Sequence, residues 1–255
     1  DVAKIKADTN NIWVYNCQQL LKPDDPAKMT FRPEMIKYYG TGCETDGIPR
    51  ECNFYLLVDP ASKRKKRSDY TAMMVVGIDS KKRRFIAEML RDKLNPKQRI
   101  DEAMALAKKW NIKESGWEEV GLGDDNFYLE EQRRKSELFF TITPIKSMTV
   151  AKEDRIRNIL MPEYAEHKWF WPVKGSMVRY STFDGRNFDL TEVLEEEFLR
   201  FPLWEHDDLL DCGTFLSQLS IVVPEESTVQ EYEGMTFGEY AKIKDERMAY
   251  ERKRP

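Results

Sequence analysis

A run of apolar residues ends abruptly in an aspartate and a proline at residues 54–61, FYLLVDPA. An unbroken run of aliphatic and aromatic residues is typical of a strand that is buried in a core. Pro60 has no N–H to donate to a neighbouring strand, so we expect the strand to end there. A carboxylate at that position is costly unless it is solvated or paired. Asp59 is therefore either an ordinary turn residue or a metal ligand at the end of a central strand.

Two more strands are expected directly after this one, at 70–79 and 83–90. A short polar turn between them predicts an antiparallel hairpin, and the loop 60–69 allows the first strand to pair antiparallel as well. The clearest helix is 95–112, where apolar residues recur at helical spacing. This order predicts an α/β fold, a mixed central sheet with helices on both faces. The later patterns predict helices over 126–139, 152–166, 187–202 and 206–223, and strands over 115–121, 139–147 and 168–173.

The two ends of the chain differ in character from its centre. Residues 1–50 are punctuated by proline and glycine, which predicts a linker-like segment and a boundary near residue 50. One domain is expected over 51–224, followed by a charged tail over 225–255. No run of eighteen apolar residues is present, so no membrane helix is expected. The first residues also lack the apolar stretch of a secretory signal, and we expect an intracellular protein.

Three aspartates gather near the start of an expected helix, EHDDLLDCGTFLSQL at 205–219. Asp207, Asp208 and Asp211 fall on one side of this helix, and its leucines form a separate apolar stripe. Like charges at this spacing repel one another. They therefore serve either as favourable charges in the first helical turn or as ligands of a divalent cation.

Glu118 and Glu119 are neighbours in the short expected strand SGWEEVG. Strand alternation lets only one of them face a given site, and alone they would be a solvent-facing pair. Together with Asp59 and the late aspartates, one of them completes a set of carboxylates. Such oxygen ligands suit Mg²⁺ or Mn²⁺, whereas the four cysteines and two histidines lack the spacing of a zinc site. Two such ions can activate water and stabilise the leaving oxygen in phosphodiester hydrolysis.

Basic residues are unevenly distributed, although the formal net charge of −4 indicates no particular partner. The run KRKKR follows Asp59 directly, at the end of the sheet where the acids are expected. Such a run is commonly a solvated surface or a localisation signal, but here it could contact phosphates and attract DNA. The second run, KKRR at 81–84, belongs to the opposite end of the hairpin. The cations expected to bind DNA are Lys63, Arg64, Lys65, Lys66 and Arg67.

The order of these elements resembles the ribonuclease H-like nuclease fold: a strand ending in Asp, a hairpin, a helix, a strand ending in Glu, and a helix with Asp-x-x-Asp. More narrowly, LLVDPA…SDYTAMMVVG, GWEEVG and HDDLLDCGTFL resemble the acidic elements of the C-terminal nuclease domain of the large terminase subunit of tailed bacteriophages. PIKSMTVAKEDRIRNILMPEYAEHKWFWP is similar to the family's segment between its second and third acids. VYNCQQLLKPDDPAKMTFRPE resembles the end of the ATPase half, so the resemblance covers about residues 11–220.

The resemblance implies a metal-dependent endonuclease that cleaves double-stranded phage DNA during genome packaging. It implies two Mg²⁺ or Mn²⁺ ions, and the choice between Glu118 and Glu119 and among the three late aspartates stays open. The residues implied as catalytic are Asp59, Glu118, Asp208 and Asp211, with Asp207 as a further candidate ligand.

The resemblance also implies partners beyond DNA, namely the ATPase half, the small terminase subunit and the portal, in the host cytoplasm. Lys152 and Arg155 lie in the resembling segment and are expected either to contact phosphates or to form structural salt bridges. No GxxxxGK[ST] motif is present, so no nucleotide site is expected in this chain. Two alternatives remain at this point: a resolvase- or transposase-type nuclease that uses the same acids, and a non-catalytic nucleic-acid-binding domain.

Overall fold

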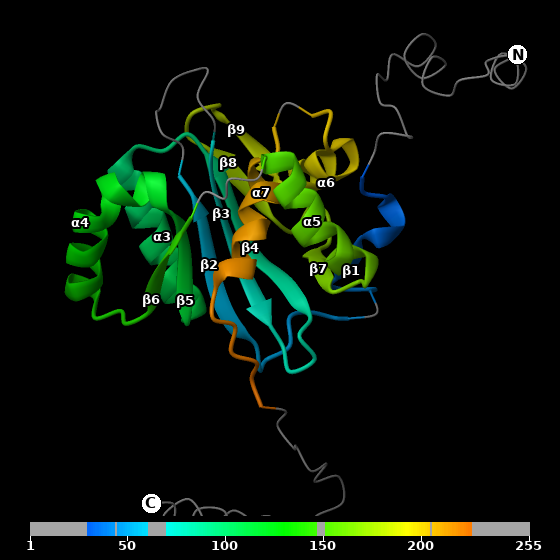
Figure 1. The fold of residues 1–255 in the computed structure, drawn as a ribbon, viewed down its shortest axis with the longest axis horizontal. Coiled ribbons are helices and arrows are strands. Elements are labelled where there is room, and N and C mark those ends of the chain that lie inside the picture. Colours follow the sequence, from blue (N-terminus) through cyan, green and yellow to red (C-terminus); the bar gives the residue numbers. More distant parts are fainter. Residues whose placement is uncertain (1–29, 44, 61–69, 147–150, 205, 226–255) are drawn as a thin grey trace, which may run out of the picture. The chain divides into compact units, whose positions relative to one another are not determined.

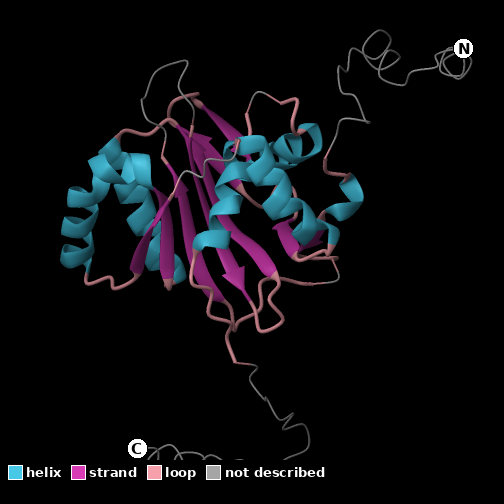
Figure 2. Cartoon of the chain, viewed as in Figure 1, coloured by secondary structure: helices cyan, strands magenta, loops and turns pink. Residues whose placement is uncertain are grey.

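The structure is a computed structural model that describes residues 30–43, 45–60, 70–146, 151–204 and 206–225. In this part of the chain, seven strands form one mixed sheet in the order β1-β7-β4-β3-β2-β5-β6, and a two-stranded hairpin forms a second sheet (Figures 1 and 2). The strands are β1 (Lys37–Tyr39), β2 (Asn53–Asp59), β3 (Thr71–Ile78), β4 (Arg84–Asp92), β5 (Glu114–Glu118), β6 (Thr141–Ile145), β7 (Trp169–Pro172), β8 (Val178–Ser181) and β9 (Arg186–Asp189).

Helices cover both faces of the sheet, as the sequence predicts (Figure 1). Helices α3 and α4 cover one face, and α5, α6 and α7 cover the other. Each face has its own apolar core, and β3, which contributes to both, is buried along its whole length. The helices are α3 (Pro96–Trp110), α4 (Glu119–Ser136), α5 (Lys152–Ala165), α6 (Leu190–Arg200) and α7 (Asp208–Thr214), with 3₁₀ turns η1 (Pro33–Met35) and η2 (Phe215–Gln218).

The strand pairing confirms the expected topology at the centre of the fold. β2 pairs antiparallel with β3, and β3 pairs antiparallel with β4 across a short turn. β2 then pairs parallel with β5, which pairs parallel with β6. Parallel neighbours need a crossover connection, which α3 supplies between β4 and β5. The carboxyl ends of β2 and β5 consequently lie side by side.

Local capping explains where α3 begins and ends. Asn95 accepts a hydrogen bond from the backbone N–H of Gln98 at 2.9 Å, and the Gln98 side chain accepts one from Asn95 N–H at 3.1 Å. This capping box satisfies two backbone donors that the helix start would leave unpaired. Asn111, in the left-handed conformation, ends the helix.

Three predicted helices have different bounds in the structure. The helix expected over 126–139 begins at Glu119, immediately after β5. The segment expected to start a helix at 187 first completes β9, because Asp189 caps α6 by accepting from the backbone N–H of Thr191 at 3.0 Å. The helix expected over 206–223 is the seven-residue α7, followed by η2 and extended chain. Hydroxyl groups there bond to nearby backbone carbonyls, which competes with a regular helix.

Two strand regions were not expected from the sequence. The β8–β9 hairpin lies within a segment that carries little apolar alternation. β1 lies before residue 50 and pairs parallel with β7 at the edge of the sheet. The main sheet therefore includes a strand from the segment that we expected to be a linker, and the limits of the domain stay predictions.

Candidate active site

Asp59 and Glu118 end two neighbouring parallel strands, β2 and β5. The register pairs Val58 with Trp117, and both of these side chains pack in the core beneath α3 and α4. Because successive side chains alternate between the faces of a sheet, Asp59 and Glu118 face the opposite side, where α7 packs on β2 and β3. Glu119 is instead the exposed first residue of α4.

Asp208 and Asp211 are buried in α7, with exposed fractions of 4% and 3%. Buried carboxylates require partners, and each of these has an arginine. Arg91, at the end of β4, donates from Nε to Asp208 Oδ2 at 3.2 Å. Arg155, on α5, donates to both oxygens of Asp211, from Nη2 at 2.7 and 2.6 Å and from Nε at 3.0 Å. Bidentate pairs of this kind fix the orientation of a carboxylate.

Arg91 belongs to a buried network that holds the first turn of α7. Its guanidinium lies 3.8 Å from the centre of the Tyr70 ring and 3.7 Å from Glu197 Oε1. Glu197, on α6, is fully buried and accepts from the backbone N–H of Leu210 at 2.9 Å. Burial raises the pKa of Glu197 well above its usual value, and burial also raises the pKa of Asp208, although Arg91 opposes both shifts. The network thus ties β4 and α6 to the helix that carries the acids.

The sequence analysis did not identify Arg91 or Glu197 as residues of the site. Arg91 follows an apolar strand in the same way as Asp59 follows another, which is the one local signal that could have marked it. Glu197 lies between apolar residues on the inner side of α6, where a carboxylate is unexpected unless it is paired.

Lys152, the first residue of α5, lies among the acids. Its Nζ is 2.6 Å from Asp207 Oδ1 and 3.4 Å from Asp211 Oδ2. Burial lowers the pKa of Lys152, but the charges of Asp211 and Asp207 outweigh this and raise it above its usual value. Asp207 itself is the N-cap residue of α7, with a side chain that is 24% exposed.

The electrostatics of the acids reflect their mutual repulsion. Burial raises the pKa of Asp59 well above its usual value, and the charges of Glu118 and Asp211 raise it further. Burial and Asp211 likewise raise the pKa of Glu118, whereas a hydrogen bond with the Asp59 side chain lowers it. Such a group of carboxylates is unfavourable without a cation to offset its charge.

The chemistry of this donor set fits a hard divalent cation such as Mg²⁺ or Mn²⁺, since every candidate ligand is a carboxylate. As the side chains stand, no three acidic, histidine or cysteine residues in the described part of the chain converge closely enough to hold a metal ion together. Arg155 and Lys152 lie against the oxygens of Asp211.

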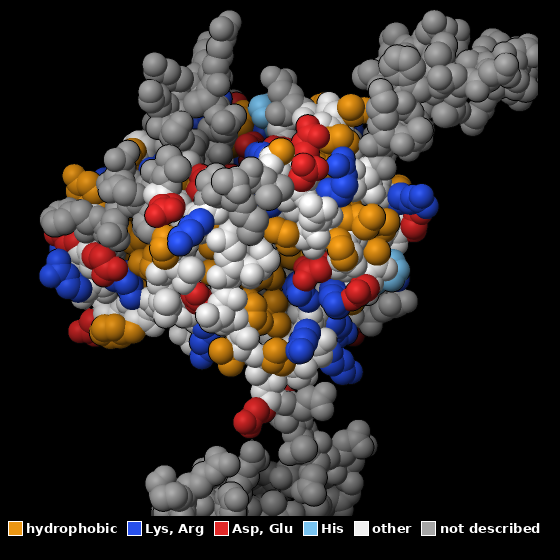
Figure 3. Space-filling view, in the orientation of Figure 1, with side chains coloured by type: hydrophobic (Ala, Val, Ile, Leu, Met, Phe, Trp, Pro, Cys, Tyr) orange, Lys and Arg blue, Asp and Glu red, His pale blue; other side chains and the backbone are white. Residues whose placement is uncertain are grey.

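Of the residues predicted to bind DNA, one group lies outside the described part of the chain and the other lies within it. Lys63, Arg64, Lys65, Lys66 and Arg67 lie outside the described residues. Lys152 and Arg155 are described, and both contact acids of the site, as in the salt-bridge alternative that the sequence left open. On the face shown in Figure 3, acidic and basic side chains are interspersed rather than segregated.

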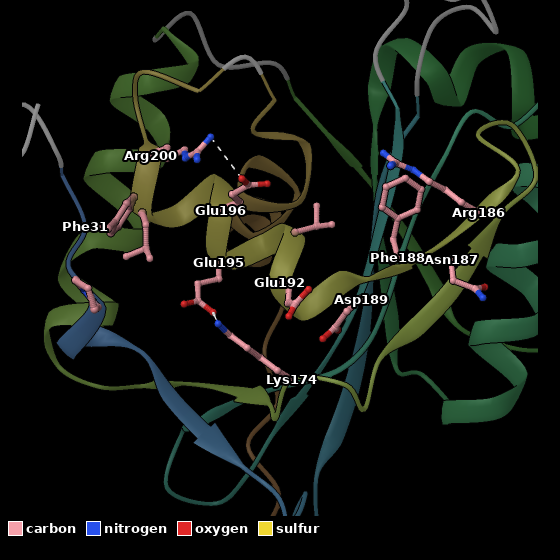
Figure 4. A pocket seen from close by; sticks show the side chains of 13 residues that line it. Phe31, Lys174, Arg186, Asn187, Phe188, Asp189, Glu192, Glu195, Glu196 and Arg200 are labelled. Atoms are coloured by element: carbon pink, nitrogen blue, oxygen red, sulfur yellow. Dashed lines mark ion pairs between the residues drawn. The ribbon is translucent and has the colours of Figure 1, made fainter. Parts of the chain in front are cut away.

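A separate hollow of about 760 Å³ lies beside α6 and β9 (Figure 4). Its rim carries the ion pairs Lys174–Glu195 and Arg200–Glu196. None of the predicted site residues lines it, so it is not part of the acidic site. Among the helices that the structure describes, none combines the length and apolar character needed to cross a membrane.

Comparison with known proteins gives a family match for part of this arrangement. Residues 56–180 match the family described as the terminase RNaseH-like domain. This segment includes Asp59, Glu118, Lys152 and Arg155, but ends before α7. A comparison with curated proteins found none that matches the sequence.

Several solved structures are similar to this chain at low identity. The large terminase nuclease from thermophilic phage G20c with bound magnesium has 15% identity and a TM-score of 0.46, over 75% of this chain and 98% of that one. The human cytomegalovirus terminase nuclease domain has 12% identity and a TM-score of 0.47, over 74% and 91%. The yeast mitochondrial Holliday junction resolvase has 9% identity and a TM-score of 0.37, over 64% and 77%.

Proposed function

Residues 56–180 belong to the terminase RNase H-like domain family, and from this premise we propose that the chain is a metal-dependent endonuclease that cleaves double-stranded DNA during phage genome packaging. The observation that carries the proposal is the gathering of acids from distant parts of the sequence at one end of the sheet. Asp59 and Glu118 end adjacent parallel strands. Asp208 and Asp211 lie on α7, which packs on β2, and their charges raise the pKa of Asp59.

The proposed catalytic residues are Asp59, Glu118, Asp208 and Asp211, with Asp207 as an additional candidate ligand. These carboxylates would hold two Mg²⁺ or Mn²⁺ ions, which, when bound, supply an activated water and stabilise the leaving oxygen. Arg91 and Arg155 orient Asp208 and Asp211 through hydrogen bonds of 3.2 and 2.7 Å. Groups that fix the orientation of ligands in this way commonly tune a metal site as strongly as the ligands do.

The rest of the proposal concerns substrate and setting. The cations of 63–67 follow β2 and would attract DNA by releasing its condensed counterions. The ATPase half, the small terminase subunit and the portal are the proposed partners, and the host cytoplasm is the proposed location. Because this chain carries no P-loop motif, we expect any ATP-driven movement of DNA to come from a partner domain.

A plasmid-cleavage assay tests the proposal directly. The protein should cut duplex plasmid with Mn²⁺ or Mg²⁺ and be inert in EDTA, and Asp59→Asn should remove cleavage while the protein stays folded by circular dichroism. Asp101→Asn is the matched control, because Asp101 is an exposed aspartate on α3, on the other face of the sheet. Equal cleavage in EDTA, or wild-type cleavage by Asp59→Asn, would overturn the proposal. A strong preference for four-way junctions over duplex would favour a resolvase-type nuclease instead.

A further inference from the structure

We propose that Lys152 is a built-in counter-ion of the acidic site, one that binds the carboxylates in the metal-free protein and must leave them when a divalent cation enters. The inference rests on the proposed function and concerns how that site is regulated. According to this inference, a divalent cation binds by replacing the Lys152 ammonium group at the carboxylates, and not by entering a site that is already free.

The position of the ammonium group carries the argument. Lys152 Nζ lies between two acids, 2.6 Å from Asp207 Oδ1 and 3.4 Å from Asp211 Oδ2. Its positive charge also opposes the rise in the pKa of Asp59, Glu118 and Asp208 that burial causes. Lys152 therefore contacts two of the five acids and acts electrostatically on the other three.

Arg91 and Arg155, the other two cations of the site, differ from Lys152 in burial and in hydrogen bonding, and these differences hold them on their carboxylates. The side chains of Arg91 and Arg155 are only 10% and 8% exposed. Arg155 makes three hydrogen bonds to Asp211, and Arg91 makes a hydrogen bond to Asp208 and an ion pair with Glu197. The Lys152 side chain is 39% exposed and ends in a compact charge on a flexible stem. It can therefore withdraw into solvent without breaking a buried network, whereas the arginines cannot.

Exchange follows from simple electrostatics. An ammonium group and a divalent cation that share the same carboxylate oxygens repel one another at contact distance. Metal binding thus requires Lys152 to move away from Asp207 and Asp211. The released ammonium stays tethered beside the acids, where the DNA phosphate must lie for cleavage, so the same residue can serve as an acid partner first and as a phosphate contact later.

This mechanism couples the binding of DNA to the binding of the metal ion. A phosphate that attracts Lys152 removes the competitor from the carboxylates and so raises metal affinity, and by linkage metal raises DNA affinity to the same extent. The site would accordingly bind the divalent cation weakly in the free protein and more tightly when DNA is bound. The metal-bound, active form would then be present mainly on DNA.

The test compares Lys152→Met with Lys168→Met in DNA-free protein. Lys168 is a matched control because its side chain is 40% exposed and pairs with Glu166, outside the acid group. Lys152→Met should melt at a lower temperature than wild type in EDTA, because the acids lose their counter-ion. Its Mn²⁺ affinity, measured by titration calorimetry, should rise roughly tenfold, since a unit charge at contact is worth about that much when partly screened. Lys168→Met should change neither quantity.

The other outcomes each overturn the inference in a distinct way. A lower melting temperature with unchanged or weaker Mn²⁺ binding would mean that Lys152 is a structural salt bridge. No change in either quantity would mean that it acts on DNA alone. If wild type binds Mn²⁺ and cleaves DNA in these cases, the proposed function stands without the inference; if neither protein binds Mn²⁺, both fail. Should Lys152→Met not fold, Lys152→Gln removes the charge and keeps a donor for Asp207.

Discussion

At the scale of single residues, the site depends on buried charges that find partners far away in the sequence. Asp208 pairs with Arg91 and Asp211 pairs with Arg155. Removing one member of such a pair leaves an uncompensated buried charge, which is strongly destabilising. The acids of α7 are therefore held in defined positions before any ligand arrives, and this preorganisation is what a charge-stabilising site requires.

The boundary between β5 and α4 falls between Glu118 and Glu119. The sequence left open which of the two faces the site. Glu118→Gln should lower DNA cleavage by at least roughly 10²-fold, the order lost when a charge-stabilising group is removed from an active site. Glu119→Gln should cleave within about twofold of wild type, because Glu119 lies exposed at the start of α4. Single-turnover cleavage rates of the two variants provide the measurement. An inactive Glu119→Gln beside an active Glu118→Gln would reverse the assignment.

At the scale of elements, the placement of β5 against η2 decides where Glu118 lies. Gly116 shares a face with Glu118, and a Cβ atom added there would lie 3.0 Å from Ile145 Cδ1 and 3.1 Å from Leu219 Cδ2. The glycine thus permits a close approach between the strand and the chain that follows α7. A side chain at this position would separate the elements that bring the acids together.

Gly116→Val should consequently lower the free energy of unfolding by about 1–3 kcal/mol, the usual cost of adding volume to a packed core. It should also reduce cleavage, because the displaced strand carries Glu118. Urea denaturation and the plasmid assay measure the two effects. Gly47→Ala is the control, since a Cβ atom there meets nothing within 4 Å; similar losses for both variants would show that the close approach at Gly116 is unimportant.

At the scale of the whole molecule, charge is distributed so that no single sign dominates. The net charge is −4, and the face in Figure 3 mixes both signs. The proposed DNA binding would then depend on local groups of cations. The run 63–67 follows Asp59, at the acid end of the β2–β3 pair, and the turn that contains Lys81 and Lys82 lies at the other end, where Asn53 pairs with Ile78.

Replacing Lys63, Arg64, Lys65, Lys66 and Arg67 by serine should weaken DNA binding and flatten its dependence on salt. On duplex DNA the slope of log affinity against log salt changes by about 0.9 for each phosphate neutralised. Binding measured by fluorescence anisotropy over a salt series checks this, and cleavage at saturating DNA should stay near the wild-type rate. Serine at Lys81 and Lys82 is the control and should leave the slope unchanged. An unaltered slope in the fivefold variant would identify the run as a solvated turn.

The sequence by itself determined the central strands, their antiparallel order, the clearest helix and the family resemblance. These depend on patterns that are local: apolar runs such as Phe54–Val58, a short turn, and helical spacing with caps, as at Asn95. The sequence also marked Asp59 and Glu118 as residues at strand ends, and the parallel pairing of β2 with β5 in the structure aligns those two ends.

Only the tertiary structure decided how the acids are held. The contacts of Lys152 and Arg155 with carboxylates depend on the approach of α5 to α7, and no periodic pattern encodes that distance. The same holds for Arg91 and Glu197, whose pairing follows from burial between β4, α6 and α7. Strand β1 likewise pairs with β7, which lies far away in the sequence. The physical reason is common to all of them: charges and edge strands are stabilised by partners distant in sequence, and those partners meet only when the chain folds.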